Sequence, residues 1–129
     1  MLGIDTNVLV RYLAADHPEQ SRKAKTLIDS QEVFVSTTAL LESEWVLRSA
    51  YGFSSVEVAN ALAAFAGLPT VTVEDTALAA RAFDWATQGM DFADALHLAK
   101  AQGCDAFVSF DRRFAKAAKA LSDIEVQTL

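Results

Sequence analysis

Two aspartates come directly after apolar segments of the kind that form buried strands. Asp5 follows residues 2–4, and Asp111 follows residues 106–110. Carboxylates that share one edge of a sheet raise each other's pKa unless a cation lies between them. Asp is also a preferred N-cap residue, and a helical pattern follows both positions. The sequence therefore leaves two roles open for this pair, helix capping and cation binding.

Two further carboxylates share one predicted helix. Glu44 has Arg48 four residues later, the favourable order for an ion pair, and we expect this pair to be solvated. Glu42 has no basic neighbour and lies among apolar and small residues. An unpaired carboxylate in such surroundings is costly unless a metal ion or hydrogen-bond donors compensate it. Glu42 is therefore either a metal ligand or an exposed residue at the rim of the helix.

Asp91 and Asp94 stand three residues apart at the start of another predicted helix. One explanation is structural, with Asp91 as the cap and Asp94 in the first turn near the positive end of the helix dipole. Asp94 also points away from the apolar face that contains Phe92 and Leu96. Periodicity does not distinguish a metal ligand from a solvated acid at this position.

Other site chemistries lack their characteristic residues. His17 and His97 stand alone and Cys104 is the single cysteine, so neither a zinc site nor an internal disulfide is expected. The chain has no G-x-S-x-G motif and no glycine-rich phosphate loop. We expect Trp45 and Trp85 in the core rather than as platforms for stacked bases.

Short apolar segments alternate with longer helical ones along the chain. The predicted strands are residues 2–4, 33–36, 70–73, 106–110 and 124–126. The predicted helices are residues 7–15, 18–29, 37–51 with Thr37 or Thr38 as cap, 54–67, 75–88, 91–102 and 111–121. This alternation predicts an α/β three-layer sandwich, with a central, mainly parallel sheet of about five strands covered by helices. Sites in such sheets lie beyond the carboxyl ends of the strands.

Length and composition limit the protein class. The 129 residues suit one domain, residues 1–129. A hydrophobic content of 52% excludes disorder. With 11 basic and 17 acidic residues the net charge is −6, which excludes nucleic-acid binding through bulk positive charge. No signal peptide or membrane span is apparent, and the lone cysteine suits a reducing compartment, so we expect a cytoplasmic protein without a membrane partner.

The hydrophobic content is high for a chain of this size, which has limited room to bury it. We therefore expect a homodimer with a largely helical interface. Tyr51, Phe53 and Phe65 are the candidate contributors, with burial in the core as the alternative for each.

Four short motifs occur in order along the chain: I-D-T-N at residues 4–7, L-E-S-E at 41–44, D-F-A-D-A-L at 91–96 and S-F-D at 109–111. Together they resemble the PIN-domain proteins, and most of all the VapC-type ribonuclease toxins of bacterial toxin–antitoxin modules. The resemblance covers essentially the whole chain. It implies a PIN-like fold and an endoribonuclease that depends on Mg²⁺ or Mn²⁺.

The resemblance also implies roles for individual residues. The acidic quartet that binds metal and catalyses cleavage is then Asp5, Glu42, Asp94 and Asp111. Asp91 is implied as an auxiliary acid, and hydrogen-bonding support is implied for Thr6, Asn7 and Ser109. The implied partners are an RNA substrate and a VapB-like antitoxin. Such an antitoxin is expected to insert an arginine among the acids, because a guanidinium binds carboxylates bidentately and excludes the metal.

The chemistry of these residues agrees with that resemblance. Mg²⁺ takes oxygen ligands, usually one or two carboxylates with waters and substrate phosphate. Such an ion activates water and stabilises the oxygens of phosphodiester cleavage. Arg112 and Arg113, directly after Asp111, are candidates to hold an RNA phosphate. Lys116 follows in the same basic segment, and exposure on a solvated helix face is its alternative to a phosphate contact.

Two other functions use similar alternations of strands and helices. A phosphohydrolase with an aspartyl nucleophile carries a second Asp two residues later, where this chain has Asn7. A phospho-receiver module needs an Asp after a mid-chain strand and a Lys after a late one, where Thr37 and Asp111 stand. A third alternative is a PIN fold kept as a non-catalytic binding module, which the intact acids disfavour.

Overall fold

The computed structural model describes all residues from 1 to 129. The strands are β1 (Leu2–Gly3), β2 (Val33–Val35), β3 (Val71–Val73), β4 (Phe107–Ser109) and β5 (Val126–Thr128). The helices are α1 (Thr6–Ala14), α2 (Pro18–Ser30), α3 (Thr37–Ser49), α4 (Ser55–Ala66), α5 (Thr76–Thr87), α6 (Phe92–Lys100) and α7 (Arg112–Leu121). Every predicted element is present, and its ends agree with the prediction to within two residues.

Each helix begins after a side chain that accepts a hydrogen bond from the backbone of its first turn. The capping residues are Asp5, His17, Ser36, Ser54, Asp75, Asp91 and Asp111. The expected cap of α3, Thr37 or Thr38, is wrong by one or two positions, because Ser36 ends its strand in extended backbone and turns its hydroxyl to the Ala39 N–H. Four of the seven caps are thus short acidic or hydroxyl side chains at the end of a strand.

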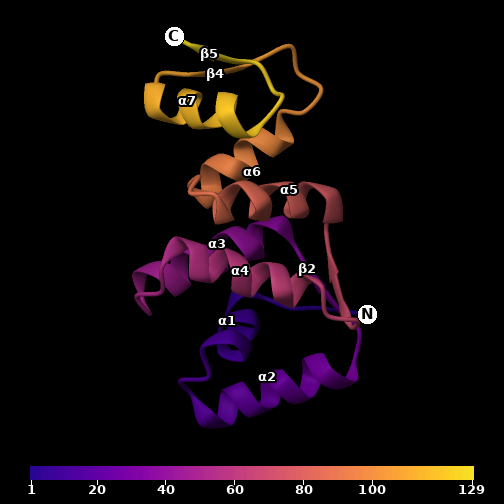
Figure 1. Ribbon diagram of the computed structural model, residues 1–129. Coiled ribbons are helices and arrows are strands. Elements are labelled where there is room, and N and C mark those ends of the chain that lie inside the picture. Colours follow the sequence, from indigo (N-terminus) through magenta and orange to yellow (C-terminus); the bar gives the residue numbers. More distant parts are fainter.

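The strands form two parallel sheets rather than one. β1, β2 and β3 pair in that order, and β4 pairs with β5. The α/β class and the parallel pairing are as expected, whereas the expected single sheet of about five strands is divided. The division follows from α6, which packs along α5 and leads β4, α7 and β5 to the far end of the elongated molecule (Figure 1).

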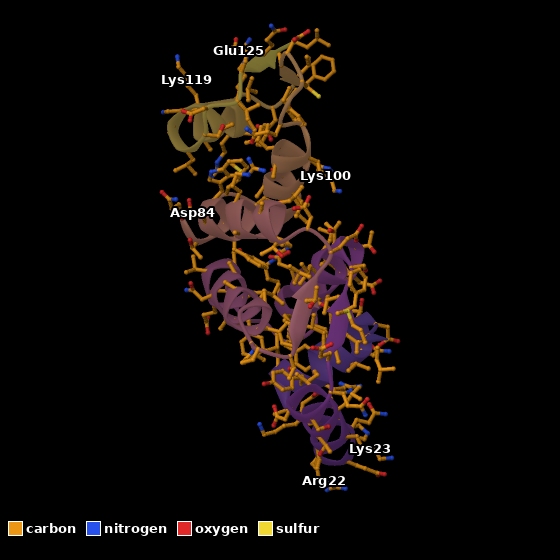
Figure 2. All side chains as sticks on the ribbon, turned by 90° about the vertical axis from the view of Figure 1, so that its right-hand side faces the viewer. Arg22, Lys23, Asp84, Lys100, Lys119 and Glu125 are labelled. Carbon is orange, nitrogen blue, oxygen red and sulfur yellow. The ribbon has the colours of Figure 1, made fainter.

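One hydrophobic core runs through both parts of the molecule. The parallel rings of Phe83 and Phe92, 5.5 Å apart, join α5 to α6. Trp85 is 5% exposed, and its indole N–H donates to the Leu121 carbonyl at the end of α7. The side chains outside this core cover the surface of the elongated shape, which Figure 2 shows from a second direction. No helix has both the length and the apolar character that crossing a bilayer requires.

Three aromatic expectations have different outcomes. Trp85 lies in the core as predicted, but Trp45 is 60% exposed, so its predicted burial is wrong. The apolar face of α3 contains Leu40 and Leu47, and Trp45 lies off that face. Of the residues proposed for a dimer interface, Phe65 is buried in the core, and Phe53 is exposed.

The two glutamates of α3 differ in burial. Glu44 is 2% exposed and accepts two hydrogen bonds from Arg48, at 2.6 Å from Nε and 3.1 Å from Nη2. The predicted ion pair is confirmed, but its predicted solvation is wrong, because Glu44 lies on the same buried face as Leu40 and Leu47. Glu42 is exposed.

The buried pair predicts a stability effect. Glu44→Gln should lower the free energy of unfolding by about 1–3 kcal/mol, because the half-buried Arg48 loses its charged acceptor at the buried Glu44 position. Urea unfolding measures the change. Glu19→Gln is the matched control, because Glu19 forms an exposed i,i+4 pair with Lys23, and its cost should stay below about 0.5 kcal/mol. Equal effects of the two substitutions would show that burial does not strengthen the Glu44 pair.

Candidate functional site

Three aspartates line one cavity of about 310 Å³. Asp91 and Asp94 come from the start of α6, and Asp111 from the start of α7. The turn from α5 to α6 forms another wall. Gly89 in that turn has φ of 106°, a left-handed conformation that favours glycine, and so allows α5 to reverse into α6. Helix starts and a tight turn thus bring these carboxylates together.

Two of these aspartates cap helices, which is the structural role that the sequence left open for them beside cation binding. Oδ1 of Asp91 accepts from the Asp94 N–H and Oδ1 of Asp111 accepts from the Phe114 N–H, both at 3.0 Å. Each cap occupies one carboxylate oxygen and fixes the position of the other. Capping therefore holds these side chains in place without using all of their ligand atoms.

Asp94 is the partly buried member of the cluster. Burial raises the pKa of its carboxyl group above the ordinary value, and the charges of Asp91 and Asp111 raise that pKa further, while His97 opposes them. The raised pKa means that negative charge in this cavity is incompletely compensated. A bound cation would supply the missing compensation.

The supporting polar residues lie close to Asp111. The Ser109 hydroxyl accepts from the Asp111 N–H at 3.0 Å and so positions the strand-to-helix turn. Arg113 lines the acidic cavity. Arg112 lines a different cavity on the other side of α7, together with Lys116. The two adjacent arginines therefore face different surfaces.

Asp5 lies elsewhere, in a cavity of about 350 Å³ between α1 and α2. It caps α1, with Oδ1 accepting from the Val8 N–H at 3.0 Å. Asn7 and Arg11 line the same cavity, and Thr6 is the first residue of α1. Asp5 is separated from Asp111 because one follows β1 and the other follows β4, which belong to different sheets.

Glu42 lies on α3 and lines neither of these cavities. Its helix is nevertheless near the acidic cluster, because α3 packs against α6. The charge of Asp91 also reaches α3. The hydrogen bond to Glu44 raises the pKa of Arg48 on this helix, and the nearby Asp91 charge raises that pKa further. The structure thus brings Asp94 and Asp111 together with Asp91, and it does not bring Asp5 or Glu42 into the same cavity.

The donor set of the acidic cavity suits a hard divalent cation. No three acidic, histidine or cysteine side chains converge closely enough to hold one ion between them. Mg²⁺ usually takes only one or two protein carboxylates, with waters completing its shell. Asp94 and Asp111, which line one cavity, provide two such carboxylates.

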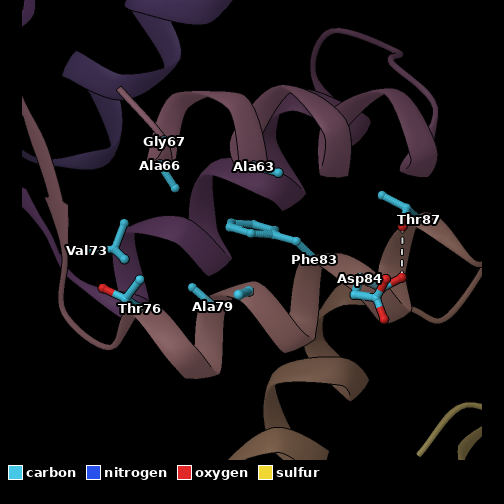
Figure 3. A pocket seen from close by; sticks show the side chains of 10 residues that line it. Ala63, Ala66, Gly67, Val73, Thr76, Ala79, Phe83, Asp84 and Thr87 are labelled. Atoms are coloured by element: carbon cyan, nitrogen blue, oxygen red, sulfur yellow. Dashed lines mark hydrogen bonds between the residues drawn. The ribbon is translucent and has the colours of Figure 1, made fainter. Parts of the chain in front are cut away.

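Another cavity, of about 410 Å³ between α4 and α5, has a different character (Figure 3). Small apolar side chains and the Phe83 ring line it, and Asp84 is its single acid. The backbone carbonyl of Asp84 accepts from the Thr87 hydroxyl at 2.8 Å. This cavity lacks the grouped oxygen ligands needed for metal chemistry.

Sequence reasoning had not included Ser55 among the site residues. Ser55 is the first residue of α4 and lines the acidic cavity. Its position after the capping residue Ser54 was readable, but the approach of the α4 N-terminus to the acidic cavity was not.

Comparisons with known proteins identify the family of this chain. The chain matches the PIN domain family over residues 3–120. Among solved structures, it is similar to the crystal structure of Mycobacterium tuberculosis VapC20, described as a sarcin–ricin loop cleaving toxin. The identity is 22%, the match covers 97% of this chain and 99% of that chain, and the TM-score is 0.46. A search of curated proteins found no match. Since the family match extends over nearly the whole length, the chain belongs to the PIN-domain family.

Proposed function

We propose that this protein is a divalent-metal-dependent endoribonuclease and the toxin of a toxin–antitoxin pair. The observation that carries the nuclease proposal is the cavity that Asp91, Asp94 and Asp111 line together. Membership of the PIN-domain family supports it. The toxin role, with a VapB-like antitoxin as partner, rests on the four motifs that resemble VapC-type toxins.

The proposed ligands of Mg²⁺ or Mn²⁺ are Asp5, Glu42, Asp94 and Asp111, with Asp91 as an auxiliary acid. Such an ion, when bound, activates water and stabilises the oxygens of phosphodiester cleavage. Ser109 holds the turn that carries Asp111. Arg113 lies in the acidic cavity, where its guanidinium can bind an RNA phosphate bidentately. Arg112 faces another cavity and is the weaker candidate for this contact.

Assembly of all four acids requires the two sheets to meet. Asp5 and Asp111 each stand two residues after a parallel strand, β1 and β4. Both strands have one unpaired edge, and both carry an exposed apolar residue, Leu2 and Val108. Unpaired edges are templates for strand pairing. β1 and β4 lie in separate sheets in this structure, and we infer that they come together when the site assembles, pairing in parallel about 4.8 Å apart and placing Asp111 beside Asp5.

Single substitutions in the quartet should abolish cleavage. Asp5→Asn, Glu42→Gln, Asp94→Asn and Asp111→Asn should each lower the rate of RNA cleavage with Mn²⁺ by at least about 100-fold, because each removes charge stabilisation from the transition state. The proteins should stay folded, since Asn also caps helices well. Asp84→Asn is the control, because Asp84 lies in the apolar cavity. Near-normal cleavage by any two quartet variants would refute the assignment.

A disulfide tests the pairing of β1 with β4. In a Cys104→Ala background, Leu2→Cys with Val108→Cys should form an intramolecular disulfide under mild oxidation, because paired strands bring these positions within bonding range. Thiol titration and non-reducing electrophoresis measure it. The control joins Leu2→Cys with Leu129→Cys, because Leu129 bonds to Ser109 from the opposite edge of β4. If the first pair cross-links no faster than the control, the strands do not meet.

The toxin proposal predicts an effect in cells. Induction of the chain in a bacterial host should arrest growth, and the Asp111→Asn variant at equal abundance should not. Growth curves with immunoblots give the comparison. Normal growth during accumulation of a chain that cuts RNA after purification would remove the toxin role and leave the nuclease.

A further inference from the structure

Trp45 is unusually exposed for a tryptophan. It is 60% exposed on α3, whereas the other tryptophan, Trp85, is 5% exposed and hydrogen-bonded to the Leu121 carbonyl. A large aromatic side chain loses favourable burial energy when it stays in water. None of the paired aromatic rings in the structure includes Trp45. Its ring is therefore free to receive a flat partner.

The surroundings of Trp45 suit a small flat ligand better than a second copy of the chain. Trp45 is the single large exposed hydrophobic residue of α3. Of its neighbours one turn away, Glu42, Arg48 and Ser49 are polar, and Leu41 is partly buried against the core. A stable homodimer buries about 800 Å² per partner around an apolar centre. A lone indole among polar side chains provides much less, but its area matches one nucleobase.

Trp45 lies on the same side of its helix as Glu42, one of the proposed metal ligands. Residues three apart on a helix lie on the same side, so Trp45 is one turn from Glu42, which is also exposed. The chain has a net charge of −6, so bulk positive charge does not attract RNA to it. Stacking of bases on aromatic rings does not require positive charge. It therefore supplies an attraction for RNA that the charge of this protein does not.

We propose that Trp45 is a stacking platform for an unpaired base of single-stranded RNA, one helical turn from Glu42. This assignment rests on the proposed nuclease function. It makes Trp45 a binding residue that places a nucleotide near the acids, since bases of single strands stack on exposed aromatic side chains.

Tryptophan fluorescence tests the platform directly. The probe is a single-stranded oligoadenylate of about 12 nucleotides, titrated in EDTA to prevent cleavage. The oligoadenylate should quench wild-type emission, and an abasic oligomer with the same phosphates should not. In Trp45→Phe the remaining emission comes from buried Trp85 and should not be quenched. Trp45→Ala should weaken oligoadenylate binding by about 5- to 150-fold, the loss expected for one stacked base.

Two results would overturn the platform. One is equal oligoadenylate affinity of wild type and Trp45→Ala. The other is a wild-type dimer in sedimentation that Trp45→Ala abolishes, because a second copy would then cover the indole. An RNA cleavage assay separates this proposal from the nuclease. Cleavage with unchanged oligoadenylate affinity in Trp45→Ala refutes the platform alone, whereas the expected quenching without any metal-dependent cleavage supports the platform and refutes the nuclease.

Discussion

Negative charge gathered at the first turns of α6 and α7 is the constraint on which the candidate site depends. Asp91, Asp94 and Asp111 share one cavity, and the pKa of Asp94 is raised by burial and by the other two charges. The positive ends of the two helix dipoles offset part of this charge. The remainder favours a cation, so the mutual repulsion of these carboxylates suits the site to bind a metal ion.

Strand-to-helix junctions explain how acidic residues can occupy such a place. Asp5 and Asp111 each follow a strand and cap the next helix through one carboxylate oxygen. Capping stabilises the fold, and the second oxygen stays available for a ligand. One residue type at one kind of junction therefore serves both folding and chemistry. This double use is why the alternatives of cap and ligand do not exclude each other.

The elements were predictable from local pattern, and their assembly was not. Periodicity and capping residues located every helix and strand, because both signals act within a few residues. The division of the sheet depends on how α6 packs on α5, a contact that no local pattern encodes. The orientation of α3 was likewise not readable, so Glu44 is buried where solvation was expected, and Trp45 is exposed where burial was expected. Among the site residues, Asp94 and Asp111 were both predicted and found together, whereas Asp5 and Glu42 lie apart from them.

The most direct test of the account is an anomalous difference map from crystals grown with saturating Mn²⁺. A metal held by this site gives a peak between Asp94 and Asp111, with β4 lying beside β1 and the Asp5 carboxylate at the ion. A map with no peak in the acidic cavity, or with its strongest peak away from these aspartates, would contradict the proposal that this PIN domain is a metal-dependent nuclease.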